Sequence, residues 1–428
     1  MKTLNIAVTS LLLIAGEAFA ASTVSDVVAR QRWPWNGKVD IDFTVTGDKT
    51  DVDFYATWDG QSTPVFLGTD YSAEAGQHRF ELNPSSVGLD GKVATGFTVT
   101  ASAVSADDHK YLVLDLASGG YEYLAAPPVG GWNNNYKSVK MVFARIPAGE
   151  YSLGLSAAEV ARWYPGTAKA EVAQQRSRAA RQQKFTSDWY MAIFQMTEAQ
   201  YAAISGEAGT KLTPKVLSYD SIRGVDSETV HWPTTGHVVA PGSFLNLFRA
   251  RFKNRFLIDL PTEEQWEAAA RAGTTTVFPT GGTTDSTDEE LWAIVNPIAW
   301  YYANGGTAAQ VVGTKAVAND WGLYDVFGNR GEWTLDVYLV DGYGRPEKRT
   351  SETDPVGPET WRPVPEVSNY RDEIAAAFGC RIFRSSYAVS QSATIPANLV
   401  PSVRSWSLPS NGTSYTARFC IHLKPLVR

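Results

Sequence analysis

Cysteine and histidine are scarce in this chain, which has two cysteines and five histidines among its 428 residues. The two cysteines, Cys380 and Cys420, match no zinc-ligand spacing. Positive charge is also in deficit, because 38 lysines and arginines stand against 45 aspartates and glutamates, a net charge of −7. Phosphate binding needs a basic face, so we expect neither nucleic acid nor an anionic membrane as a partner.

Long hydrophobic runs are missing beyond the N-terminus. Lys2, an apolar run over 4–14 and small residues at Ala18 and Ala20 together predict a cleaved export signal over 1–20. The alternative is a membrane anchor, but the run is too short to span a bilayer comfortably. We therefore expect a periplasmic or secreted protein without a membrane span.

Export also bears on the two cysteines, because disulfides persist in oxidising compartments. A disulfide between Cys380 and Cys420 is expected in such a protein. The alternative is a pair of free thiols.

Aromatic residues are abundant, at 12% with 14 tryptophans, and the N-terminal third alternates apolar and polar residues. Short alternating runs are separated by Gly, Pro, Asn and Asp, as in 39–45, 52–56 and 110–116. This pattern predicts an antiparallel β-sandwich, immunoglobulin-like, over residues 22–136. We find no catalytic constellation in it, and we expect His78 and His109 to be solvated.

From residue 139 onward, helical patterns and long loops replace this alternation. Thr197 and Thr262 are each followed three residues later by glutamine, a pairing that predicts a capping box at a helix N-terminus. Acidic residues in the first turn of both segments favour the same assignment.

Four segments of the C-terminal two-thirds, in order, resemble one known family. They are VFARIPAGEYSLG (142–154), WYMAIFQMTEAQY (189–201), LPTEEQWEAAARAG (260–273) and WGLYDVFGNRGEWT (321–334). They resemble the sulfatase-modifying factor family, whose founding member is formylglycine-generating enzyme. The resemblance implies that residues 139–428 form a loop-rich variant of the C-type lectin fold with a small sheet and two helices. The whole chain is then α+β, with the β-sandwich followed by this domain.

The last of these segments carries a candidate calcium site. Hard oxygen ligands in a turn-rich loop are what calcium binds. The resemblance implies a structural calcium held by the Asp325 and Glu332 carboxylates and by the Gly328 and Arg330 carbonyls. The alternative is that both acids merely cap loop amides.

The thiols that the family's enzyme needs are absent from the matching segment. That enzyme oxidises a substrate cysteine with copper(I) held by two thiolates, and other side chains do not replace such soft ligands. Aligning residues 381–390 with the family pattern places Val389 and Thr394 at the two thiol positions, or Ser390 and Ile395 in the other register. We therefore expect neither copper nor the enzyme's reaction.

Without the enzyme's reaction, the predicted function of the C-terminal half is ligand binding. Aromatic and small polar residues supply rigid contact area and adaptable hydrogen bonds, and here they are Tyr387, Ser390, Thr394, Arg404 and Trp406. The sequence thus predicts an exported ligand-binding or interaction protein, built on a catalytically inactive domain with structural calcium. Its ligand would be a glycan, peptide or protein. The alternatives are an oxidoreductase of the family with atypical active-site residues, and a purely structural surface protein.

Overall fold

The computed structural model describes residues 22–32, 37–89, 91–166, 179–225, 237–315, 317–338, 353–356, 380–385 and 399–423. The expected export signal (1–20) and three of the expected binding residues, Tyr387, Ser390 and Thr394, lie outside these ranges. The chain forms two compact units, Met1–Val104 and Ser105–Arg428. In the described ranges, no helix has the length and apolarity needed to cross a membrane.

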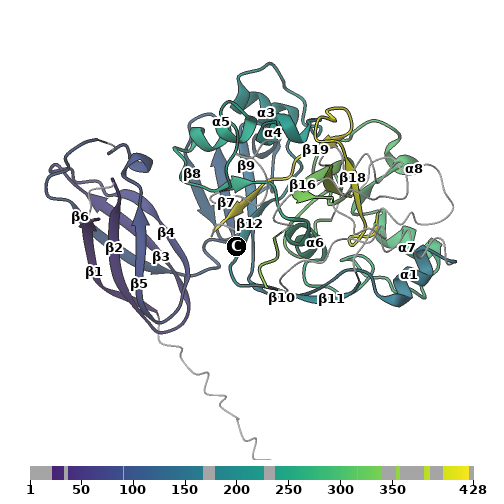
Figure 1. The fold of residues 1–428 in the computed structure, drawn as a ribbon, viewed down its shortest axis with the longest axis horizontal. Helices are drawn as coiled ribbons and strands as arrows, with labels where there is room; N and C mark the ends of the chain where they lie inside the picture. Colours follow the sequence, from purple (N-terminus) through teal and green to yellow (C-terminus); the bar gives the residue numbers. More distant parts are fainter. Residues whose placement is uncertain are drawn as a thin grey trace, which may run out of the picture. The chain divides into compact units, whose positions relative to one another are not determined.

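The first unit consists of two three-stranded antiparallel sheets (Figure 1). One has the order β1-β2-β5, with β1 (Thr23–Gln31), β2 (Val39–Thr46) and β5 (Gly76–Leu82). The other has the order β4-β3-β6, with β3 (Thr50–Thr57), β4 (Val65–Ala73) and β6 (Thr98–Val104), and a 3-10 turn η1 (Pro84–Val87) follows β5. Alternate residues of both sheets fill one core, with Ile41 and Phe43 from β2 and Val52 and Phe54 from β3. The predicted strands are confirmed here, and the immunoglobulin-like arrangement stays a prediction.

The second unit begins earlier than expected, because the last strands assigned to the N-terminal domain belong to it. β7 (Tyr111–Asp115) pairs with β8 (Tyr121–Leu124) and with β9 (Lys140–Ile146). Tyr111–Leu114 are all buried, as in a central strand that is covered on both faces. The compact units therefore divide between Val104 and Ser105, whereas the expected domain boundary lies at residue 136. His109, expected in solvent, is buried with its ring 4.1 Å from that of Tyr123.

The main sheet of the second unit has six strands in the order β13-β20-β12-β9-β7-β8. Its other members are β12 (Trp189–Ala192), β13 (Ile258–Asp259) and β20 (Cys420–His422). A four-stranded sheet has the order β18-β17-β16-β19, with β16 (Gly331–Val337), β17 (Arg381–Arg384), β18 (Arg404–Ser407) and β19 (Tyr415–Thr416). Two-stranded pairs are β10 (Gly149–Leu153) with β11 (Arg181–Phe185), and β14 (Ala299–Trp300) with β15 (Phe327–Gly328).

Seven α-helices occur in the described part of this unit, so the fold is mixed α+β with more strand than helix, as predicted in outline. They are α1 (Ala157–Trp163), α3 (Glu198–Ser205), α4 (Tyr219–Arg223), α5 (Phe244–Arg251), α6 (Glu263–Arg271), α7 (Asp288–Val295) and α8 (Tyr302–Gly305), with a 3-10 turn η2 (Asn134–Lys137). Both predicted capping boxes are confirmed. The Thr197 and Thr262 hydroxyls accept the backbone N–H of Gln200 and Gln265 at 3.0 and 3.1 Å.

Helix α6 is the structural centre of the second unit. It contacts β10, β16 and β17, and all nine of its residues are buried, including three glutamates. Buried charges need partners, so the surroundings of α6 must supply cations and hydrogen-bond donors. That requirement determines which side chains surround α6.

Candidate functional site

The loop segment 325–332, which contains β15 and the start of β16, turns the carbonyl groups of Asp325, Gly328 and Arg330 inward. Asp325, Gly328 and Asn329 have φ angles of 54°, 80° and 56°. This backbone conformation is uncommon for residues other than glycine. At Gly328 a Cβ atom would lie 1.9 Å from the carbonyl oxygen of Trp300. The parallel pairing of Trp300 with Gly328 thus requires glycine at this position.

Four oxygens of this loop converge on one atom, the side-chain nitrogen of Gln195. Nε2 lies 2.8 Å from the Arg330 carbonyl oxygen and 2.8 Å from Glu332 Oε1. The carbonyl oxygens of Asp325 and Gly328 are 3.3 and 3.5 Å away. We call these four atoms the oxygen cluster. It contains the atoms predicted as calcium ligands in Gly328, Arg330 and Glu332, and calcium binding itself stays a prediction.

Glu332 is the charged member of the oxygen cluster, and Arg418 holds it in place. The guanidinium donates from Nε to Oε2 at 2.9 Å and from Nη2 to Oε1 at 2.8 Å. The indole N–H of Trp266, on α6, donates to Oε2 at 2.6 Å. Arg418 and Glu332 are both fully buried, so charge pairing and hydrogen bonds replace the water that the carboxylate has lost.

Asp325 differs from the prediction, because its carbonyl oxygen rather than its carboxylate belongs to the oxygen cluster. The carboxylate accepts the Gly313 N–H through Oδ2 at 2.6 Å. Its Oδ1 is buried and has no hydrogen-bond partner among the described residues. Burial raises the pKa of this carboxyl to about 6.

These residues fit a hard cation such as calcium. Calcium takes carboxylate, carbonyl and amide oxygens, and the loop supplies three carbonyls and one carboxylate around a common point. Two buried oxygens beside them, Gln195 Oε1 and Asp325 Oδ1, have no described hydrogen-bond partner. Gln195, Arg418 and Trp266 were not predicted as site residues, although all but Arg418 lie within the family-like segments.

The two described members of the predicted binding face do not form an open surface. Arg404 is 2% exposed and donates to Glu263 Oε1 at 2.8 Å, so its prediction as a ligand-binding residue is wrong. Trp406 is half-buried, and its ring packs 5.6 Å from that of Tyr338. Arginine is drawn inward here because buried Glu263 requires a cationic partner.

Neighbouring charges on α6 are balanced in the same way. Glu267 pairs with Arg271 at 3.0 Å and with Arg384 at 3.3 Å, and Arg181 pairs with Glu264 at 2.9 Å. Three nearby carboxylates, Glu263, Glu264 and Asp336, could geometrically surround a metal ion. Arginines already neutralise the two glutamates, so we interpret this cluster as an ion-pair network of the core.

Both cysteines are free thiols in the structure, so the predicted disulfide is wrong. Cys380 precedes β17 in the four-stranded sheet and Cys420 lies in β20 of the six-stranded sheet, and both are fully buried. Burial raises the pKa of the Cys380 thiol to about 12, and that of Cys420 also lies well above its usual value. Cys380 lies just before β17 and Cys420 lies within β20, and the sequence alone does not show how far apart two such positions lie in the fold.

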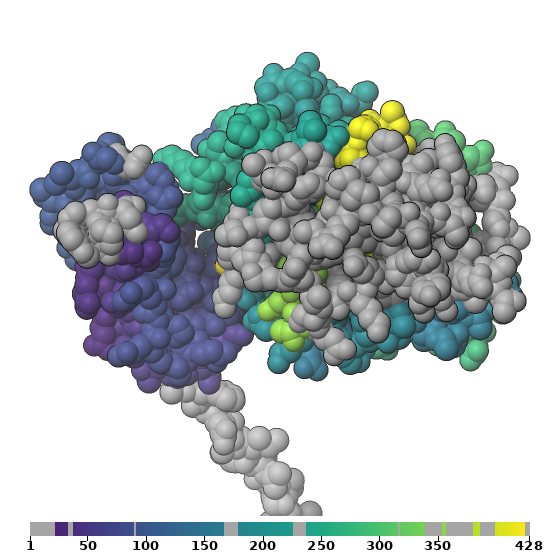
Figure 2. Space-filling model, viewed as in Figure 1, coloured from purple at the N-terminus to yellow at the C-terminus, as the bar shows by residue number. Residues whose placement is uncertain are grey.

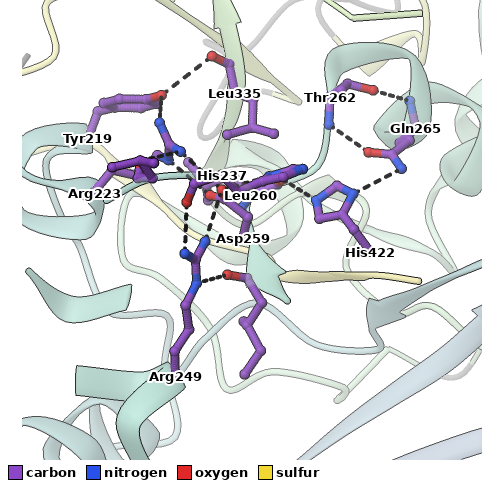
Figure 3. A network of polar contacts seen from close by, with 12 residues as sticks. Tyr219, Arg223, His237, Arg249, Asp259, Leu260, Thr262, Gln265, Leu335 and His422 are labelled. Atoms are coloured by element: carbon purple, nitrogen blue, oxygen red, sulfur yellow. Dashed lines mark hydrogen bonds and ion pairs between the residues drawn. The ribbon is translucent and has the colours of Figure 1, made fainter. Parts of the chain in front are cut away.

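A second buried polar network is centred on Asp259 (Figure 3). Its carboxylate accepts hydrogen bonds from Arg223 at 3.0 and 3.1 Å, from Arg249 at 3.2 Å and from the N–H of Leu260 at 2.8 Å. The Nδ1 atom of His237 lies 3.0 Å from the same carboxylate. This network joins α4 and α5 to β13, and it places His237 in the core.

His422 extends this network toward α6. Its Nε2 lies 3.1 Å from the Leu260 carbonyl oxygen, and its ring is 4.4 Å from that of His237. Burial lowers the pKa of His422 to about 3 and also lowers that of His237. Both imidazoles are therefore neutral at physiological pH.

Comparisons with known proteins indicate the same family as the four sequence segments. The family model described as "Sulfatase-modifying factor enzyme 1-like domain" matches residues 133–384. A bovine (Bos taurus) protein named "Inactive C-alpha-formylglycine-generating enzyme 2" is 39% identical over 80 residues, which is 18% of this chain and 27% of that protein. A Thermomonospora curvata protein named "Formylglycine-generating enzyme" is 34% identical over 105 residues, 24% of this chain and 34% of that protein. The chain thus matches only about a quarter to a third of the length of these relatives.

Proposed function

We propose a binding rather than an oxidising function for this chain, which belongs to the sulfatase-modifying factor family. In this proposal it is an exported, catalytically inactive member that recognises a glycan, peptide or protein. The first unit would be immunoglobulin-like, and the second unit would be a variant of the C-type lectin fold.

The state of the two cysteines is the observation that carries this proposal. Copper(I) chemistry needs a pair of accessible thiolates. The chain has only Cys380 and Cys420, and burial of both side chains raises their thiol pKa values, which disfavours the thiolate. One group of relatives bears the word "inactive" in its name, which agrees with this interpretation.

The experiment is an oxidation assay with copper, oxygen and a cysteine-containing peptide, read by mass spectrometry. A relative named formylglycine-generating enzyme serves as the positive control. We expect the peptide incubated with this chain to keep its cysteine. Conversion to formylglycine would establish the alternative, an oxidoreductase of the family with atypical residues.

The proposed binding face includes the loop that follows β18. Leu408, Ser410, Gly412 and Thr413 are exposed, and this C-terminal segment, drawn in yellow, reaches the surface in Figure 2. The Asp220 N–H donates to the Pro409 carbonyl at 3.1 Å, which fixes the loop against α4. We propose that Tyr387, Ser390 and Thr394 act together with this loop.

Glycan and peptide arrays test this binding face. We expect Tyr387→Ala and Leu408→Asp each to weaken the binding of a ligand detected on the arrays, while the melting temperature stays unchanged. Exposed Val93 lies in the other unit, so Val93→Asp is the matched control. A ligand whose binding is insensitive to both changes would contradict this choice of surface.

Structural calcium is the proposed cofactor, and the oxygen cluster supports it. Calcium would be held by the carbonyls of the 325–330 segment and by Glu332, and it would supply the positive charge that these oxygens attract. We expect calcium to raise the melting temperature of the chelator-treated protein, because a ligand of the folded state stabilises it. No shift at millimolar calcium would contradict the proposal.

A further inference from the structure

We propose that Gln195 is a reversible member of the calcium site: its amide nitrogen occupies the oxygen cluster without the ion, and its amide oxygen turns inward to bind the ion. This inference rests on the calcium proposal above. In this inference, Gln195 stabilises the calcium-free form and also contributes part of the affinity for calcium.

The hydrogen-bond count around Gln195 is the first argument. An amide nitrogen carries two hydrogens, yet four oxygens lie within 3.5 Å of it. Only the contacts to Arg330 and Glu332, at 2.8 Å, have good hydrogen-bond length. Asp325 and Gly328 are left with long contacts, so one amide does not satisfy the whole oxygen cluster.

The other end of the same amide is the second argument. Gln195 is fully buried, and its Oε1 has no hydrogen-bond partner among the described residues. A buried acceptor without a donor is unfavourable. Turning the amide over would bring this oxygen into the oxygen cluster, where a cation would be its partner.

The spacing of the atoms makes such an exchange geometrically reasonable. Calcium binds oxygens at about 2.4 Å, which places neighbouring ligands about 3 Å apart. The Gln195 nitrogen is 2.8 to 3.5 Å from the four oxygens. If the amide oxygen of Gln195 took this place, it would lie at the distance that separates two ligands of the same calcium ion. Without the ion the four oxygens would repel it, and with the ion all five oxygens would bind the same cation.

The backbone around Gln195 is anchored, so the movement is confined to the side chain. The Tyr324 N–H donates to the Ile193 carbonyl, and the Met196 N–H donates to the Ala417 carbonyl. Thr197 then caps α3. Glutamine suits this position because one planar group offers both a donor and an acceptor.

Three variants of the full chain test the role of Gln195 by calorimetric calcium titration and by terbium luminescence. Trp266, whose N–H contacts Glu332, would sensitise the bound terbium. We expect Gln195→Met to bind calcium about tenfold or more weakly, because it loses one oxygen ligand. Gln195→Glu should bind more tightly than the wild type, and its calcium-free form should melt at a lower temperature.

Gln200→Met is the matched control. Gln200 is also buried and its amide also donates to a backbone carbonyl, that of Lys140 at 2.8 Å, but it does not face the oxygen cluster. We expect this variant to lose stability and to keep the wild-type calcium affinity. It separates the loss of a buried amide from the loss of a ligand.

The outcomes distinguish this inference from the calcium proposal. If the wild type binds calcium and Gln195→Met binds it equally well, Gln195 is not a ligand and only this inference fails. If the wild type does not bind calcium, the calcium proposal fails; binding by Gln195→Glu alone would then show that the amide replaces the ion permanently. If Gln195→Met does not fold, a Gln195→Glu affinity no higher than that of the wild type overturns the inference.

Discussion

At the scale of single residues, the second unit contains many fully buried charges, and several of them form buried ion pairs. Arg418 with Glu332 and Arg223 with Asp259 are completely buried pairs. Such pairs add little net stability compared with apolar residues, but losing one partner leaves an uncompensated charge. Single substitutions here should therefore be far more harmful than at the surface.

Glu332→Gln tests this expectation. We predict a loss of about 3–5 kcal/mol in unfolding free energy, because Arg418 would remain buried without its counter-charge. The matched control is Glu122→Gln, which breaks the partly exposed pair with Lys140 at 2.9 Å. There the loss should be below about 1 kcal/mol, and equal losses in urea unfolding would refute the argument.

The two buried histidines predict how stability depends on pH. His237 and His422 have lowered pKa values in the fold, with that of His422 at about 3, whereas unfolded histidine titrates near about 6.5. Below that pH the unfolded chain binds more protons than the folded one, so stability falls as the pH drops from about 6.5 toward 3. Asp325, with its pKa raised to about 6, works in the opposite direction over part of this range.

Replacing one histidine checks this sign. In His422→Phe, the decline in unfolding free energy between pH 6 and 4 should become shallower by about 1.4 kcal/mol per pH unit, the contribution of one proton. His78→Phe, in the first unit, should leave the slope of the second unit's transition unchanged. A His422→Phe slope equal to that of the wild type would show that His422 is charged in the fold.

At the scale of elements, the pairing of β14 with β15 depends on one glycine, Gly328. Gly328 has a φ of 80°, and a Cβ atom added to it would collide with Trp300, whereas Gly206, at the C-terminus of α3, has a φ of 79° and open space around it. Gly206→Ala should cost about 1 kcal/mol from backbone strain alone. Gly328→Ala should cost several times more, about 3 kcal/mol or above, because the backbone pairing must open. Denaturant unfolding of both variants measures the two losses of unfolding free energy. Similar losses would mean that the backbone at Trp300 moves aside easily.

Elements differ in how well local sequence predicts them. The starts of α3 and α6 follow from Thr197 and Thr262, because a capping box satisfies its own backbone groups within four residues. The apolar residues of Tyr111–Asp115 predict a strand, but they do not predict its pairing with β9 in the sheet of the second unit. Its partner β9 lies about thirty residues away, and residue alternation does not specify which strand is the partner.

At the scale of the whole molecule, the chemistry of the cysteines depends on where the sheets place them. Cys380, just before β17, and Cys420, within β20, are both fully buried, so we predict that a thiol-reactive reagent labels neither in the native protein and both after denaturation. Non-reducing mass spectrometry should find no disulfide. Rapid labelling of either thiol in the native state would reopen the case for catalysis.

Residue order alone was enough to indicate the family, the absence of thiols at the copper positions and the helix caps, because each depends on neighbouring residues or on composition. Contacts between distant segments decided the rest. Gln195 joins the oxygen cluster across more than a hundred residues, and Arg404 turns inward to Glu263. Such pairings are set by the cost of burying charge and unpaired oxygen, and that cost exists only once the fold has removed water from around them.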